Sequence, residues 1–203
     1  MYKRQLLARR VLITEGKTEY DVYSMASRKM QRLHPEKSYS FDLLGIALVN
    51  AETDTQVSAL GQYYKWLGKT VYAVFDKQED KDSEQIASAV DYAFEANERG
   101  IENVVLKEID KSVLLRFALE IVKNGDWPAN LSDKTPSEGM NGDELFNTMK
   151  TYFKHKKGDG ALSELVQFCE EDEMPRSIKD IIINIGKTVY PDSACSSDDI
   201  NEE

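Results

Sequence analysis

The sequence has little cysteine or histidine and no long run of apolar residues. Its 203 residues include two cysteines and two histidines. Cys169 and Cys195 are far apart, and His34 and His155 stand alone, so the spacing excludes a disulfide framework and a zinc or redox motif. This predicts a reducing, cytoplasmic setting. No apolar run approaches the roughly 20 residues that a membrane span needs, and the basic N-terminal segment has no apolar core of a secretory signal.

The sequence also has no excess of positive charge. Its formal net charge is −10, which by itself argues against nucleic acid as a partner. The segment 191–203 holds five acids and no base, so the other 190 residues carry 31 acids against 26 bases, or −5. A metal ion bound by several of these acids would reverse the charge locally. Net charge therefore does not exclude a nucleic-acid substrate.

What the sequence does contain is an alternation of short apolar runs and helical periodicities over its first 110 residues. Strands are predicted at 11–14, 43–50, 70–76 and 103–106, and helices at 18–33, 53–67 and 82–99. The runs are short and almost continuously apolar, as in strands covered on both faces. The fold class that follows is α/β, a Rossmann-like parallel sheet flanked by helices.

The pattern changes beyond residue 110, where only helices are predicted. They cover 112–123, 142–156, 161–171 and 177–189, with a loop at 125–140. The organisation predicted is an α/β core at 1–110, a helical subdomain at 111–190 and a disordered acidic tail at 191–203.

The segment 10–19, Arg-Val-Leu-Ile-Thr-Glu-Gly-Lys-Thr-Glu, carries the strongest functional signal. It places Glu15 at the end of the first strand and Glu19 in the first turn of the next helix. Residues four apart are neighbours on a helix, and ligands of open parallel sheets gather at the carboxyl ends of the strands. The pair is therefore suited to bind a hard cation such as Mg²⁺.

Gly16-Lys17-Thr18 also matches the last three residues of a phosphate-binding loop, but the rest of that motif is missing. The loop needs another glycine five residues earlier, and Val11 occupies that position. The residues between are strand-like and end in the negative Glu15. A nucleotide-binding loop at this place is excluded, because a backbone cradle for phosphates needs a glycine-rich turn.

Acidic residues follow every predicted strand. They are Glu15 and Glu19 after the first strand, Glu52 and Asp54 after the second, Asp76, Glu79 and Asp80 after the third, and Glu108 and Asp110 after the fourth. Polar residues also begin loops and cap helices, so any one of these acids has a simpler explanation. Four strand ends together favour a metal site. An all-oxygen donor set selects Mg²⁺ or Mn²⁺ over zinc, and two such ions can stabilise both oxygens in phosphodiester cleavage.

The basic counterpart is the segment Lys154-His155-Lys156-Lys157-Gly158. Lysines at a helix C-terminus complement the helix dipole, and Gly158 suits a C-terminal cap, so the segment has a structural explanation. One of its lysines could instead stabilise the negative charge of a phosphoryl transition state.

Together, strand-Glu15-Gly16-helix and a later strand-Asp76 resemble the Toprim domain. The form Glu-Gly-Lys-Thr-Glu, with a late Lys-Gly in a helical segment, is similar to the OLD-family nucleases, and in particular to the C-terminal Toprim region of their Gabija anti-phage branch. The resemblance covers roughly residues 8–190 and implies a Toprim fold and a Mg²⁺- or Mn²⁺-dependent DNA endonuclease with a two-metal site.

The resemblance also implies roles for individual residues. Glu15 matches the Toprim glutamate that binds metal or transfers a proton, and Glu19 and Asp76 match further metal ligands. Lys157 matches the late lysine that supports the transition state. The sequence departs from the pattern at Gln78, which stands where the second aspartate of Asp-x-Asp is expected. Asp80 is the replacement predicted here, and Asp110, with Glu108 as its alternative, is the acid predicted after the fourth strand.

In that family the Toprim region follows an ATPase domain, so the resemblance implies a nuclease region of an anti-phage ATPase-nuclease. It implies DNA, an N-terminal ATPase domain and a helicase-like protein as partners, and a homo-oligomer is possible. Two alternatives stay open. One is a primase-like or topoisomerase-like Toprim enzyme, and the other is a non-catalytic module that binds DNA or protein, which the missing aspartate at Gln78 supports.

Overall fold

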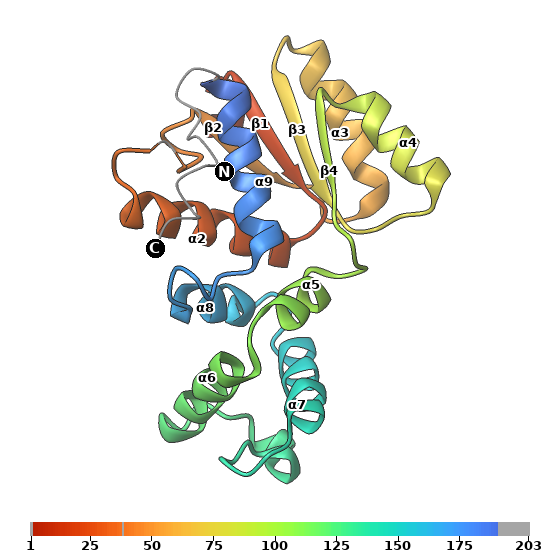
Figure 1. Ribbon diagram of the computed structural model, residues 1–203. Coiled ribbons are helices and arrows are strands. Elements are labelled where there is room, and N and C mark those ends of the chain that lie inside the picture. Colours follow the sequence, from red (N-terminus) through yellow and green to blue (C-terminus); the bar gives the residue numbers. More distant parts are fainter. Residues whose placement is uncertain (1, 38, 191–203) are drawn as a thin grey trace.

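A four-stranded, all-parallel sheet forms the centre of the N-terminal half. The computed structural model describes residues 2–37 and 39–190, so the predicted acidic tail at 191–203 lies outside the described residues. The strands are β1 (Arg10–Thr14), β2 (Ile46–Asn50), β3 (Thr70–Phe75) and β4 (Tyr92–Glu95), in the order β2-β1-β3-β4. The predicted α/β class is confirmed (Figure 1).

Helices cover both faces of the sheet, which explains why β1 and β3 are almost wholly buried. On one face lie α3 (Asp54–Trp66) and α4 (Asp80–Ala89), packed on a cluster that includes Val11, Ile13 and Phe75. On the other face lie α2 (Lys17–Leu33) and α9 (Arg176–Val189), which share a cluster with Leu12 and Tyr72. Successive residues of β1 thus point to opposite faces, as the pleat requires. Figure 1 shows these two layers on either side of the strands.

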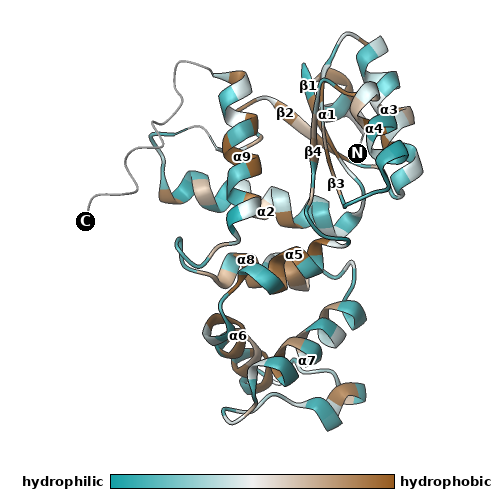
Figure 2. Cartoon of the chain, turned by 45° about the vertical axis from the view of Figure 1, so that its right-hand side comes forward, coloured by the Kyte–Doolittle hydropathy of each residue, from teal (hydrophilic) through white to brown (hydrophobic). Residues whose placement is uncertain are grey.

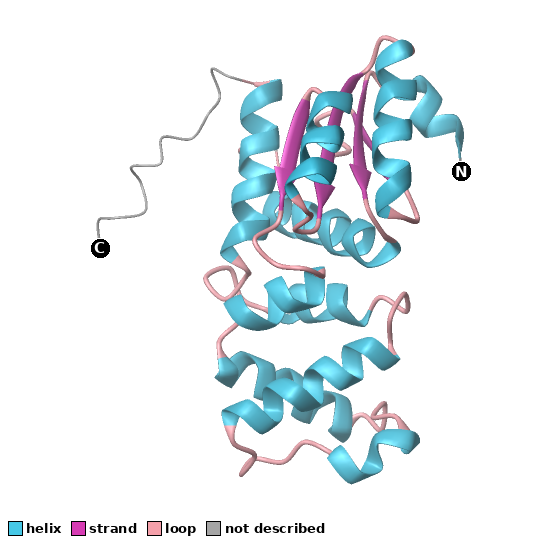
Figure 3. Ribbon diagram, turned by 90° about the vertical axis from the view of Figure 1, so that its right-hand side faces the viewer, coloured by secondary structure: helices cyan, strands magenta, loops and turns pink. Residues whose placement is uncertain are grey.

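The short N-terminal helix α1 (Tyr2–Leu7) lies beside β2. The remaining described helices extend from the carboxyl ends of the strands. They are α5 (Ile101–Glu108), α6 (Lys111–Lys123), the 3-10 helix η1 (Ala129–Lys134), α7 (Gly142–His155) and α8 (Ala161–Phe168). Figure 3 shows the strand arrows pointing toward α5 and α8, with α6 and α7 beyond them. The edge of the sheet that binds ligands in parallel folds therefore faces helices.

The helical second half shares its core with the sheet. One apolar cluster runs from Leu12 of β1 through α2 and α5 to Met149 and Ile182, and Figure 2 shows apolar residues along the inner sides of these helices. The helices α8 and α9 pack against α2. Only α6, η1 and α7 project away from the sheet.

A buried lysine fastens α8 to α2. Lys29 of α2 is 8% exposed, and its Nζ donates to the carbonyl oxygens of Val166 at 3.2 Å and Gln167 at 2.9 Å, and to that of Cys169. These carbonyls end α8 and have no partner within the helix, so a cation there complements the helix dipole. The contact holds the second half of the chain to the first.

The fourth strand and the helix after it differ from the prediction. The strand lies at Tyr92–Glu95, inside the predicted helix 82–99, and the predicted strand 103–106 belongs to α5. β4 is an edge strand, and the side chains of Tyr92 and Glu95 are exposed. The segment therefore lacks the alternation of apolar and polar residues that marks a strand in a sequence. In α5 the buried residues Ile101, Val104 and Val105 form one helical face. None of the helices at 2–37 and 39–190 is both long and apolar enough to cross a bilayer.

Candidate functional site

The two central strands bring Glu15 and Asp76 together. β1 and β3 pair in parallel, with Thr14 opposite Val74, so the residues that follow them leave the sheet side by side. The backbone N–H of Asp76 donates to Oε2 of Glu15 at 3.1 Å. The two acids predicted at these strand ends therefore share one location.

Glu19 lies against the same location from the first turn of α2. It is 9% exposed, and its pKa is raised to about 7, mainly by burial and in smaller part by the charges of Asp76, Glu102 and Glu15. A hydrogen bond from its own backbone N–H acts in the opposite direction. A Cβ at Gly16 would lie 2.7 Å from Oε2 of Glu19. Glycine at position 16 thus leaves room for the carboxylate to fold back over the helix N-terminus.

Asp76 is half-buried and is held by the loop between β4 and α5. Its Oδ2 accepts a hydrogen bond from the backbone N–H of Gly100 at 2.6 Å. Gly100 has φ +83°, a left-handed conformation that favours glycine. The pKa of Asp76 is raised to about 6, mainly by burial and also by the charge of Glu15, although the Gly100 hydrogen bond and the charge of Lys157 act in the opposite direction.

Glu102 completes a cluster of four carboxylates, and the sequence analysis did not include it. It lies in the first turn of α5, next to the loop that binds Asp76, and its charge raises the pKa of both Glu19 and Asp76. We call Glu15, Glu19, Asp76 and Glu102 the acid cluster. The signal that could have found Glu102 is Gly100, which begins a helix with an acid in its first turn.

Lys157 is the cation beside the acid cluster. It follows the end of α7, and its charge lowers the pKa of Asp76. Lys157 and Lys156 line a small cavity together with Glu102 and Thr18. The lysine predicted from the Lys-Gly segment thus lies at the same edge of the sheet as the acids.

Gln78 donates to the acid cluster instead of adding an acid to it. Its Nε2 donates to Oε2 of Glu15 at 3.3 Å, and its backbone N–H donates to Oε1 of Glu95 at 2.9 Å. Asp80, the predicted replacement, is exposed and begins α4. No contact within residues 2–37 and 39–190 joins Asp80 to the cluster. Besides Glu15, the acid that Gln78 contacts is therefore Glu95, at the end of β4.

The structure does not bring Asp110 or Glu108 to the acid cluster. Glu108 is the last residue of α5, about 9 Å along the helix axis from Glu102 at 1.5 Å per residue, and Asp110 lies beyond the end of α5. Asp110 is the N-cap of α6, where the hydroxyl and backbone N–H of Ser112 lower its pKa, and Oε2 of Glu108 accepts from the backbone of Ser177 at 2.9 Å. The prediction for Asp110 depended on a strand at 103–106, and that segment is helical.

The donor set of the acid cluster fits a hard divalent cation in its chemistry. All its ligating atoms are carboxylate oxygens, which Mg²⁺ and Mn²⁺ prefer. The raised pKa values of Glu19 and Asp76 show that these acids repel one another in a partly desolvated place, and a cation would remove that repulsion. Among the residues that the structure describes, however, no three acidic, histidine or cysteine side chains already surround one point as in a completed metal cage.

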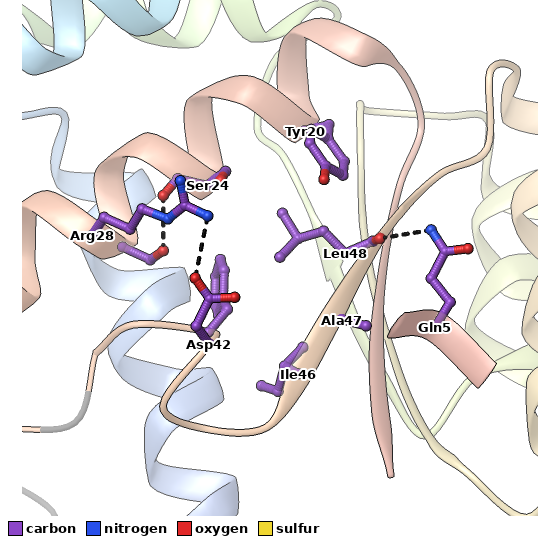
Figure 4. A pocket seen from close by; sticks show the side chains of 10 residues that line it. Gln5, Tyr20, Ser24, Arg28, Asp42, Ile46, Ala47 and Leu48 are labelled. Atoms are coloured by element: carbon purple, nitrogen blue, oxygen red, sulfur yellow. Dashed lines mark hydrogen bonds and ion pairs between the residues drawn. The ribbon is translucent and has the colours of Figure 1, made fainter. Parts of the chain in front are cut away.

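A cavity of the N-terminal half lies away from the acid cluster. It has a volume of about 470 Å³ and is bounded by α2, β2 and α1, with Tyr20, Arg28, Asp42 and Leu48 among its lining residues (Figure 4). Arg28 pairs with Asp42 at 3.2 Å, and Gln5 donates to the carbonyl oxygen of Leu48 at 3.1 Å. None of the four residues of the acid cluster lines this cavity.

Comparisons of sequence and of structure give different results. No family model matches the chain, and no curated protein is similar to it in sequence. Among solved structures, the C-terminal region of the Xanthomonas campestris pv. campestris OLD protein is similar with a TM-score of 0.58 at 11% identity, covering 92% of this chain and 96% of that one. The C-terminal region of the Burkholderia pseudomallei OLD protein has a TM-score of 0.57 at 14% identity, covering 90% and 99%. This chain therefore has the fold of OLD-protein C-terminal regions along nearly its whole length.

Proposed function

We propose that this chain is a Toprim/OLD-type endonuclease that hydrolyses phosphodiester bonds in DNA and depends on Mg²⁺ or Mn²⁺. The observation that carries the proposal is the acid cluster: four carboxylates from the ends of β1 and β3 and from the first turns of α2 and α5, with Lys157 beside them. The likeness in fold to OLD-protein C-terminal regions supports it.

Glu15, Glu19, Asp76 and Glu102 are the residues that would hold the metal. Gln78 and the backbone of Asp76 orient Glu15, and Gly100 orients Asp76. When bound, divalent ions supply charge neutralisation for the attacking and leaving oxygens of a phosphodiester. The carboxylates lie on rigid strand ends and helix termini, so little reorganisation is needed to present them.

Lys157 has the complementary role on the substrate. Its ammonium group is exposed and lies close enough to Asp76 to change the pKa of that residue. A phosphate bound at the acid cluster would therefore lie beside a positive charge, which stabilises the additional negative charge of the transition state.

Plasmid cleavage tests the proposal. Supercoiled plasmid is incubated with the protein and Mg²⁺ or Mn²⁺, and the wild type is compared with Glu15→Gln and Asp76→Asn. We expect each variant to lose at least about 100-fold in nicking rate, as for removal of one group that stabilises transition-state charge. Asp54→Asn is the matched control, because Asp54 begins α3 outside the acid cluster. Equal nicking by the wild type and both site variants contradicts the assignment.

A non-catalytic binding module is the second candidate. Two observations favour it: Gln78 replaces an expected acid, and the described carboxylates do not form a completed cage. Calorimetric titration separates the two candidates. Binding of Mn²⁺ or Mg²⁺ that Asp76→Asn abolishes supports the nuclease, and no binding at millimolar metal supports the module.

The biological setting proposed is anti-phage defence. The similar solved structures are C-terminal regions of OLD proteins, and the resemblance in sequence implies an ATPase domain before the Toprim region. Expression of the natural full-length protein in a bacterial host, with and without Asp76→Asn, tests this setting by phage plaque counts. Equal counts for both would contradict a defence role that depends on cleavage.

A further inference from the structure

Three lysines form a line on the exposed side of α7 and end at the acid cluster. Lys150 and Lys154 lie four residues apart on α7, a spacing that places side chains on one helix face, and Lys157 follows the end of the helix. All three are exposed. The opposite face of α7 is buried through Leu145, Thr148, Met149, Tyr152 and Phe153. We call Lys150, Lys154 and Lys157 the lysine stripe.

The lysine stripe has no acidic partner of its own. Other cations of the protein do: Lys17 pairs with Asp21, Lys107 with Glu98 at 2.7 Å and Arg116 with Glu173 at 2.8 Å. No ion pair joins any lysine of the stripe to a carboxylate within the described part of the chain. Their charges are therefore available to an external anion.

The helix dipole does not account for the whole stripe. Lysines in a last turn complement the dipole, an effect that falls off within that turn. Lys154 is in the last turn of α7, but Lys150 is outside it and Lys157 follows the helix. Lys154 and Lys157 both lie at the C-terminus of α7, so the dipole accounts for these two charges but not for Lys150, which lies further from that end.

We propose that the lysine stripe binds the sugar–phosphate backbone of DNA on one side of the bond to be cleaved. The inference rests on the proposed function for the identity of the ligand as nucleic acid. Lys157 lies beside Asp76, and the stripe continues from there along α7, away from the sheet (Figures 1 and 3). Lys150 and Lys154 are about 6 Å apart along the helix axis. Phosphates recur at regular intervals along one DNA strand, so lysines spaced along α7 can contact phosphates of the same strand.

The surroundings of the stripe favour a nucleic-acid backbone over a membrane surface. Near the lysines α7 carries the exposed Asn147 and His155 and the partly buried Thr151, and its first turn carries the exposed acids Asp143 and Glu144. A helix that inserts into a lipid surface presents an apolar face beside its lysines, and the apolar face of α7 is buried in the protein. Separate point charges on a polar helix face suit phosphate contacts that carry no sequence information.

The salt dependence of DNA binding tests the inference. Fluorescence anisotropy measures binding of a labelled duplex of about 20 base pairs in EDTA, so that nothing is cleaved, over about 50 to 200 mM salt. The variant is Lys150→Gln/Lys154→Gln, which leaves Lys157 in place. We expect the slope of log Kobs against log salt to become shallower by about 2, since each phosphate contact contributes about 0.9. Affinity at the lowest salt should fall about tenfold.

The matched control is Lys37→Gln/Lys187→Gln, which removes the same charge from the loop after α2 and from α9. Figure 1 shows these elements on the sheet side of the molecule, far from α7. We expect the control to keep the slope of the wild type. Equal slopes for the stripe variant and the wild type overturn the inference, as does a control that loses as much as the stripe variant. Binding to anionic phosphatidylserine vesicles, with none to DNA, also overturns it.

Cleavage measured in parallel separates this inference from the proposed function. If the wild type binds DNA through the stripe but does not nick plasmid with Mg²⁺ or Mn²⁺, the nuclease proposal fails and the backbone contact stands. If the wild type nicks plasmid and the stripe variant binds and nicks equally well, the stripe inference fails and the nuclease proposal stands.

Discussion

The acid cluster and the lysine stripe are two neighbouring charged regions that differ in burial. The acid cluster combines Glu15, Glu19, Asp76 and Glu102 in a partly desolvated place, and two of its members have raised pKa values. The lysine stripe carries its charges on exposed side chains. In the acid cluster, neighbouring carboxylates contribute to the raised pKa values of Glu19 and Asp76, whereas no ion pair within the described residues joins a lysine of the stripe to a carboxylate.

This difference suggests different consequences for stability and for binding. Buried like charges reduce the stability of the folded chain until a cation or protons neutralise them. Exposed charges contribute little to stability, but they attract polyanions in a salt-dependent way. Substitutions in the acid cluster should therefore change both stability and chemistry, whereas substitutions at Lys150 and Lys154 should change binding alone.

The largest effect that sharpens this comparison is expected at Glu102, the acid found only in the structure. Because it shares the charge environment of Glu19 and Asp76, we expect Glu102→Gln to lower metal-dependent nicking by about 100-fold. Glu108→Gln is a matched control on the same helix: Glu108 lies at its other end, and glutamine can still accept from Ser177. Similar rates for Glu102→Gln and Glu108→Gln would remove Glu102 from the site.

A second test concerns the pH dependence of stability without metal. The pKa of Glu19 rises from 4.5 to about 7 on folding, so between these values the folded chain binds more protons than the unfolded chain. The free energy of unfolding must then fall as the pH rises through this window. We expect Glu19→Gln to be more stable than the wild type by about 2 kcal/mol near pH 8 in EDTA, and by much less near pH 4.5. Urea denaturation at both pH values measures the difference.

Lys154→Gln is the counterpart from the stripe in the same experiment. Its side chain is exposed, so we expect a change below about 0.5 kcal/mol at both pH values. A wild-type stability that does not fall with pH, or a Glu19→Gln variant that is no more stable near pH 8, would contradict a raised pKa of Glu19 in the folded chain.

Three members of the acid cluster could be placed from the sequence because local patterns determine their positions. A buried apolar run followed by Glu15 or Asp76 predicts the end of a central strand, and Glu19 follows from the helix that begins at once. The strands β1 and β3 lie within a residue or two of the predicted ranges. Their parallel pairing then brings Glu15 and Asp76 together.

The rest depended on tertiary structure. β4 is an edge strand whose residues Tyr92–Glu95 pair with β3 although the local sequence is typical of a helix. The apolar run at 103–106 is too short for its periodicity to distinguish a strand from a buried helix. Because the fourth strand was misplaced, Asp110 was predicted at the metal site and Glu102 was not. The position of Lys157 beside Asp76 depends on how α7 returns to the sheet, which the resemblance implied and periodicity could not.

A smaller effect than those in the acid cluster is expected at Asp110, where the structure gives a capping role in place of the predicted metal ligand. Its carboxylate accepts from the backbone N–H and the hydroxyl of Ser112 at 2.7 and 2.6 Å and caps α6. We expect Asp110→Ala to lower the free energy of unfolding by about 1 kcal/mol through loss of the cap, with no change in nicking rate. Urea denaturation and plasmid nicking measure the two quantities.

Asp110→Asn separates the cap from the charge, because asparagine caps helices as well as aspartate does. The protein already uses this residue at the start of α7, where Oδ1 of Asn141 accepts from the backbone N–H groups of Asp143 and Glu144 at 3.1 and 2.9 Å. We therefore expect Asp110→Asn to keep both stability and activity. A loss of nicking in Asp110→Asn with unchanged stability would return Asp110 to the metal site, since only its charge would have been removed. The acid cluster would then extend from Glu102 to the N-cap of α6.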